Sequence, residues 1–88
     1  MDLNSFEKHF IQLKSPLLLI KGAKGLLACG YLNIETFNKT GEVAAIVTGV
    51  RTHEDMLKAK VILASNAARE VGIELGMSGE EALMRFHS

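Results

Sequence analysis

The stretch VAAIVTGVRTHEDMLKAK, residues 43–60, decides the fold. Its first five residues are apolar without alternation, which is typical of a strand that is buried on both faces. Thr48-Gly49 ends this run. Thr52 then stands three residues before Asp55, a spacing close to that of a capping box at a helix start. The stretch therefore predicts a buried strand over residues 43–47 that passes through a turn into a helix.

The helix that follows this junction is predicted to be long. Apolar residues recur on one stripe from Leu57 to Val71, and polar residues lie opposite them. Gly72 stands where a glycine commonly ends a helix. We therefore predict one long helix over about residues 53–71. Its apolar arc covers roughly 160° of the circumference, which is more than one packing layer needs.

A second helix start lies near residue 80. Ser78 and Glu81 have the spacing of a capping box, in which the side chain of each residue accepts the backbone N–H of the other. The residues after it predict a short helix from Glu80 to Phe86.

Short apolar runs between breaks predict strands in the first third of the chain. Residues 5–13 are interpreted as an edge strand, and Pro16 interrupts the chain after them. Residues 17–31 predict a hairpin whose loop is the four-residue segment 22–25, since its two glycines tolerate a tight turn.

A short helix is predicted between the hairpin and the strand at 43–47. Asn33 is a suitable cap for a helix that runs to about Lys39, and Thr40-Gly41 ends it. The order strand, helix, strand permits a parallel pair. These elements predict a single α+β domain over residues 1–88. We expect about four strands in a mixed or antiparallel sheet, with the long helix of about residues 53–71 packed on it plus short helices.

Composition excludes several classes of function. Lys plus Arg and Asp plus Glu number 10 each, so no basic surface is expected and nucleic acid is an unsuitable partner. The longest strictly apolar run, residues 17–20, is far below the roughly 20 residues that span a bilayer, so we expect no membrane partner. A single cysteine and no signal-like start predict a cytoplasmic protein. The three histidines show no metal-ligand spacing, and we expect neither metal nor cofactor.

Several short motifs, in their order and spacing, resemble one known family. They are Cys29-Gly30-Tyr31-Leu32-Asn33, Ala44-Ala45-Ile46-Val47-Thr48-Gly49-Val50-Arg51, Asp55-Met56-Leu57 with Ala59-Lys60-Val61, and Gly76-Met77-Ser78-Gly79 with Glu81-Ala82-Leu83. Over residues 17–86 the chain is similar to the YunC-like family of small bacterial and archaeal proteins, a domain of unknown function. The resemblance implies an α+β domain and a soluble intracellular protein, and it implies no activity. The N-terminal segment looks short beside the family pattern.

The junction at residues 48–52 is a candidate anion site. Free backbone N–H groups at a helix start attract anions, and an arginine can hold a carboxylate or phosphate through two hydrogen bonds. The candidate ligand-binding residues are Thr48, Gly49, Arg51 and Thr52. The alternative interpretation is a capped turn in which Arg51 takes part in a structural ion pair. No glycine-rich phosphate motif is present to decide between them.

Cys29 is a candidate reactive thiol. A free cysteine in a strand is commonly a small buried apolar residue, whereas a nucleophile needs a nearby base or positive charge. His53 is the candidate base if the fold brings the two residues together. The alternative function is therefore a small enzyme with a site built from Cys29, Arg51 and His53.

A homo-oligomer is predicted from the surplus of apolar surface. Two strands without alternation need cover on both faces, and a chain of 88 residues gains stability by burying surface against a copy of itself. A twofold dimer is the simplest form. The function expected from the sequence is a homo-oligomeric binding protein for a small anionic ligand or a protein partner.

Overall fold

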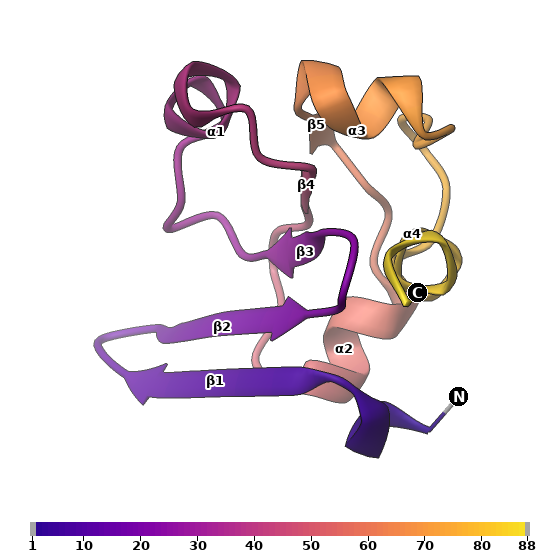
Figure 1. Ribbon diagram of the computed structural model, residues 1–88. Coiled ribbons are helices and arrows are strands. Elements are labelled where there is room, and N and C mark those ends of the chain that lie inside the picture. The colour runs from indigo at the N-terminus through magenta and orange to yellow at the C-terminus, as the bar shows by residue number, and fades with distance from the viewer. Residues whose placement is uncertain (1, 88) are drawn as a thin grey trace.

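The computed structural model describes residues 2–87 and contains a mixed sheet with helices on both faces (Figure 1). The strands, which lie in the sheet in chain order, are β1 (Glu7–Gln12), β2 (Pro16–Lys21), β3 (Leu26–Ala28), β4 (Ala44–Ile46) and β5 (Leu63–Ala64). The helices are α1 (Ile34–Thr40), α2 (His53–Lys58), α3 (Asn66–Glu70) and α4 (Gly79–Phe86), and a 3-10 turn spans Leu3–Ser5. The predicted α+β class is confirmed.

The pairing of the strands confirms the predicted hairpin and the predicted edge strand. Within residues 2–87, β1 pairs with β2 alone, and β2 also pairs with β3; both pairs are antiparallel. β3 and β4 are parallel, and α1 connects them as the predicted short crossover. Asn33 caps α1 by accepting the N–H of Glu35, and Gly41 ends it with a φ of 81°. Local signals in the sequence were sufficient for this part of the fold.

The prediction of one long helix over residues 53–71 is wrong. α2 ends at Lys58, and the chain then runs extended to Ala64 before α3 begins. In this segment the N–H of Ile62 donates to the carbonyl of Ile46 at 2.9 Å, which forms the fifth strand beside β4. Residues 61 and 62 are β-branched and suit an extended chain. Pairing with β4 therefore outweighs the helical periodicity of this segment.

Ser65 explains why a new helix starts after β5. Its backbone N–H donates to Ala44, which continues the pairing with β4. Its buried hydroxyl accepts the N–H of Ala68 at 3.1 Å as the cap of α3, and it also donates to the carbonyl of Glu42 at 2.7 Å. The predicted end of the helical region is close to the observed one, because Gly72 has a φ of 95° just after α3.

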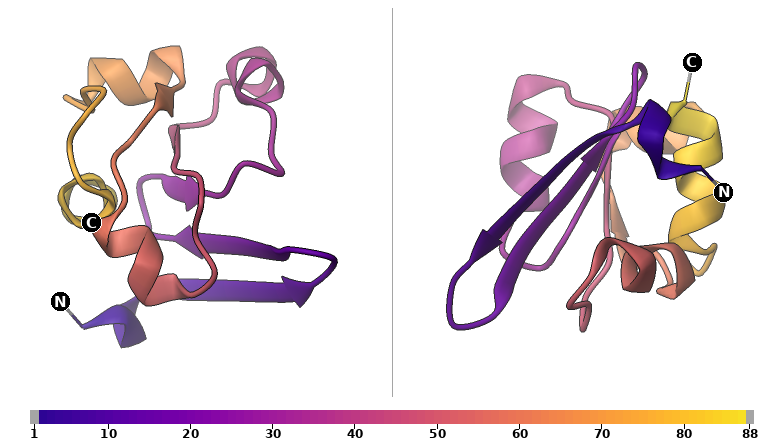
Figure 2. Two further views of the ribbon diagram at one scale, coloured as in Figure 1. Left: turned by 180° about the vertical axis from the view of Figure 1, so that it is seen from behind. Right: turned by 90° about the horizontal axis from the view of Figure 1, so that it is seen from below.

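The inner face of the sheet holds the main core. α2 and α4 lie on this face, and α1 lies on the opposite side (Figure 2). Side chains from β2, β3 and β4 meet those of the two helices in one buried cluster, which includes Leu18, Ile20, Leu27, Val47, Met56, Leu83 and Phe86. The end of α4 is tied to the turn after β2, since the N–H of Lys24 donates to the carbonyl of Phe86 at 2.9 Å.

The outer face of the sheet is covered unevenly. The register places Leu19, Ala28 and Ile46 on this face, one beside the other across β2, β3 and β4. α1 packs against β4 there, and Ala28 and Ile46 are buried. On β1 and β2, by contrast, Ile11 is 53% exposed and Leu17 and Leu19 are only half-buried. We call Ile11, Leu17 and Leu19 the bare patch.

Candidate functional site

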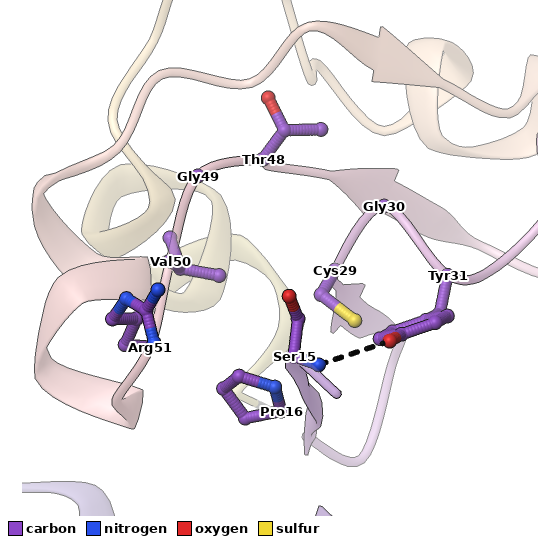
Figure 3. A pocket seen from close by; sticks show the side chains of 9 residues that line it. All are labelled: Ser15, Pro16, Cys29, Gly30, Tyr31, Thr48, Gly49, Val50 and Arg51. Atoms are coloured by element: carbon purple, nitrogen blue, oxygen red, sulfur yellow. Dashed lines mark hydrogen bonds between the residues drawn. The ribbon is translucent and has the colours of Figure 1, made fainter. Parts of the chain in front are cut away.

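A pocket of about 460 Å³ opens at the carboxyl ends of the parallel strands β3 and β4, next to the start of β2 (Figure 3). Its lining comprises Ser15, Pro16, Cys29, Gly30, Tyr31, Thr48, Gly49, Val50 and Arg51. Crevices at the carboxyl ends of parallel strands are common ligand sites in sheets that carry helices. Thr48, Gly49 and Arg51, three of the four residues predicted for an anion site, line this pocket.

Parallel pairing explains why two loops meet here. β3 and β4 end at the same edge of the sheet, so residues 29–31 and 47–51 leave it side by side. The N–H of Val47 donates to Ala28 at 3.0 Å and extends the pairing one residue beyond the strands. Gly49 then turns the chain with a φ of 73°, a conformation that favours glycine. The turn directs the next residues towards the start of α2.

Arg51 contributes the positive charge of the pocket. Its backbone N–H donates to Oδ2 of Asp55 at 3.1 Å, which fixes the backbone at this position. Its exposed guanidinium forms no ion pair or hydrogen bond with any side chain or backbone group of residues 2–87. The structural ion pair that we considered as an alternative is therefore not found among the described residues.

The hydroxyl groups of Thr52 and Thr48 are not positioned to bind a ligand in the pocket, although the sequence had suggested that they would be. Thr52 caps α2, since its Oγ1 accepts the N–H of Asp55 at 3.0 Å, and it does not line the pocket. This confirms the predicted helix start. The methyl group of Thr48 faces Gly30, where an added Cβ would lie 3.1 Å from it. In Figure 3 the Thr48 side chain points away from those of Cys29 and Tyr31.

Cys29 forms part of the wall of the pocket. The residue is 3% exposed, and the N–H of Leu18 donates to its Sγ at 3.3 Å. Across the loop the hydroxyl of Tyr31 accepts the N–H of Ser15 at 3.3 Å, which joins the end of β3 to the turn before β2. Sequence reasoning did not find Ser15, Pro16 or Tyr31 as pocket residues. The antiparallel pairing of β2 with β3 brings them there, and the predicted hairpin was the signal that could have found them.

His53 lies apart from this pocket. Its Nε2 donates to the carbonyl of His9 at 3.0 Å, and the side chain lines a different hollow together with Lys8 and Glu54. Cys29 and Arg51 share the first pocket. The predicted combination of Cys29, Arg51 and His53 is therefore not assembled in one site.

No group of three or more His, Cys, Asp or Glu residues among residues 2–87 is placed to hold a metal ion. In the same range no helix has the length and apolar character needed to cross a membrane.

Comparisons with known proteins give consistent matches. A family model described as "Domain of unknown function (DUF1805)" matches residues 28–86, a range that contains every pocket residue after Pro16. The uncharacterized protein YunC of Bacillus subtilis (strain 168) is 34% identical over 77 residues, which cover 83% of this chain and 76% of YunC. The crystal structure of TA1206, a protein of unknown function from Thermoplasma acidophilum, matches with a TM-score of 0.81 at 39% identity over 92% of each chain.

Proposed function

The chain belongs to the DUF1805 family of domains, as its YunC-like motifs predicted, and from that premise we propose that it binds a small anion in the pocket between the ends of β3 and β4. The observation that carries this proposal is the guanidinium of Arg51 in the pocket lining, which has no ion-pair or hydrogen-bond partner among residues 2–87. A cation without a partner in a concave site is a suitable contact for a carboxylate or phosphate oxygen.

Backbone donors support the same proposal. The N–H groups of Gly30, Thr48 and Gly49 form no hydrogen bond within residues 2–87, and all three residues line the pocket. Backbone N–H groups in loops of this kind can donate to anions in addition to a charged side chain. The lining contains no Asp or Glu that would repel a negative ligand.

The first test is the thermal stability of the protein in the presence of anions. A ligand at ten times its dissociation constant stabilises the folded state by about 1.4 kcal/mol, which raises the melting temperature of a small domain by several degrees. We expect millimolar phosphate, sulfate or acetate to raise the melting temperature of the wild type, and we expect the rise to shrink in Arg51→Ala.

Arg69→Ala is the matched control for this test. Arg69 is exposed on α3 and lines none of the pockets described above, so the variant loses the same charge elsewhere. An equal response of wild type, Arg51→Ala and Arg69→Ala would indicate general exclusion of the salt from the protein surface, and the site would be rejected.

A catalytic role for Cys29 lacks support from a nearby base, since His53 lies in the other hollow and bonds His9. We therefore propose that the Cys29 thiol is a structural part of the pocket wall. A single free cysteine suits a reducing compartment, and we propose a cytoplasmic location.

We also propose that two copies pair through the bare patch. Ile11, Leu17 and Leu19 form an apolar surface on the outer face beyond α1. Charged groups border this surface: Glu7 bonds His9 and lies opposite Lys21. The hydrogen bond from His9, together with its charge and that of Lys21, lowers the pKa of the Glu7 carboxyl. An apolar centre with a polar border is the usual composition of an interface.

The accessible surface of one chain limits the size of this interface. It is 5167 Å², close to the roughly 5,100 Å² expected of a monomeric protein of this mass, so a single chain is already well packed. We therefore expect a modest contact that buries about 1,000–1,600 Å² in total.

Light scattering after size exclusion tests the dimer. We expect a mass of two chains at micromolar concentration and a mass of one chain for Ile11→Glu, since a buried charge opposes the contact. Met84→Glu is the control, because Met84 is an exposed residue of α4 on the other side of the sheet. A wild-type mass of one chain that stays constant as concentration rises would contradict the dimer.

A further inference from the structure

The pocket carries a single formal charge. Arg51 is the only ionisable Lys, Arg, His, Asp or Glu side chain among its nine lining residues. A dianion would bring a second negative charge that no cation in this lining can neutralise, and transfer of an unpaired charge out of water is unfavourable. The charge of the pocket therefore favours a ligand with one negative charge.

The rest of the lining is suited to an apolar group. Pro16 is buried, and Val50 is 9% exposed. Tyr31, whose ring is about half exposed, forms a further wall. Figure 3 shows Arg51 and Tyr31 on opposite sides of Pro16. A ligand whose charged end contacts Arg51 would therefore extend past Pro16 towards the ring of Tyr31.

We infer that the ligand class is a small monocarboxylic acid with a short apolar body, an inference that rests on the proposed function. A carboxylate matches the planar guanidinium of Arg51 through two parallel hydrogen bonds. The body then covers Pro16, Val50 and the Tyr31 ring. The pocket volume of about 460 Å³ lies within the range of small-molecule sites, which run from about 300 to 1,000 Å³.

The test compares acetate, butyrate and phosphate by calorimetric titration at equal ionic strength. Acetate carries the charged group alone, butyrate adds two methylenes, and phosphate adds charge without an apolar body. Burial of two methylenes predicts that butyrate binds about tenfold more tightly than acetate. We also expect phosphate to bind more weakly than butyrate.

Two substitutions separate the contributions of the two ends of the pocket. Arg51→Ala should abolish binding of both acetate and butyrate. Tyr31→Ala should lower the affinity for butyrate severalfold and leave that for acetate unchanged, a difference that a general loss of structure would not produce. Phe10→Ala removes another half-exposed aromatic ring that does not line the pocket, and it should change neither affinity.

The possible results distinguish this inference from the function on which it rests. Phosphate binding that depends on Arg51 and is tighter than butyrate binding would overturn the inference and leave the anion site in place. Equal affinities for acetate and butyrate would do the same. If none of the three anions shows binding that depends on Arg51, both the anion site and the monocarboxylate inference are overturned.

Discussion

The starts of α2 and α4 have similar sequences and very different surroundings. Thr52 and Ser78 each cap their helix by accepting the N–H of the acidic residue three positions later. At α4 the box is complete, because the carboxylate of Glu81 also accepts the backbone N–H of Ser78. At α2 the shorter Asp55 accepts the N–H of Arg51, one residue earlier, instead of that of Thr52.

The capping pattern that α2 and α4 share has a different role in each helix, because the surroundings of the two helix starts differ. Gly79, the first residue of α4, is buried, and a Cβ added there would overlap the carbonyl oxygen of Met56. The start of α2 is exposed, and its cap holds the backbone of Arg51 beside the pocket. The same capping pattern therefore begins a helix that completes the core at α4, and at α2 it positions a candidate ligand contact.

The largest expected effect is at the buried start. Gly79→Ala forces a methyl group against backbone that a side-chain rotation cannot move, so we expect a loss of about 3 kcal/mol in the free energy of unfolding. Urea unfolding measures it. Gly41→Ala is the control: its Cβ would meet nothing within 4 Å, and the positive φ alone should cost about 1 kcal/mol. Equal losses would mean that α2 and α4 can move apart freely, which would remove the contrast between the two starts.

The two caps should differ by a smaller amount. Thr52→Ala and Ser78→Ala should each cost roughly 0.5–2 kcal/mol. We expect Ser78→Ala to be the more damaging, because Ser78 donates to and accepts from the turn of a helix that completes the core. Thermal or urea unfolding of the two variants gives the order. No measurable loss in Thr52→Ala would mean that the hydroxyl does not secure the start of α2.

The smallest expected effect is a change in acetate affinity when a charge is removed at the start of α2. Asp55→Asn keeps an oxygen that can accept the N–H of Arg51 and removes a negative charge close to the pocket. We expect an increase of about twofold in acetate affinity at low salt, and screening should abolish it at high salt. Glu81→Gln makes the same change at an exposed residue in the first turn of α4, away from the pocket, and should leave acetate affinity unaltered. An increase of the same size in both variants would indicate an effect of net charge.

Local signals explain which parts of the fold could be predicted. Asn33 and Ser78 act within a few residues of themselves, and α1 and α4 appear where they were expected. The hairpin also appears where it was expected. The two glycines of its loop, however, have no positive φ, and a Cβ at either one would overlap Phe86 of α4. Residues 59–64 have a helical period, but their conformation is set by pairing with β4, which is distant in the sequence. Periodicity alone cannot report such a pairing.

The same distinction between local and distant interactions applies to the residues of the candidate site. Thr48, Gly49 and Arg51 follow directly from the junction of strand and helix, so the sequence predicted their proximity. Ser15, Pro16 and Tyr31 reach the pocket through the pairing of β2 with β3 and the hydrogen bond between Ser15 and Tyr31. The absence of His53 from the pocket also follows from tertiary structure, because α2 directs that side chain to the carbonyl of His9.

The attachment of α4 to the turn after β2 has a consequence for synthesis on the ribosome. Phe86 is fully buried against strands that are made more than fifty residues earlier, and its carbonyl binds Lys24. All five strands and α2 leave the exit tunnel before α4 does, so the part of the inner face that α4 covers stays exposed until then. We expect the nascent sheet to be a substrate for chaperones until residues 79–86 emerge, and the core to close in one late, cooperative step.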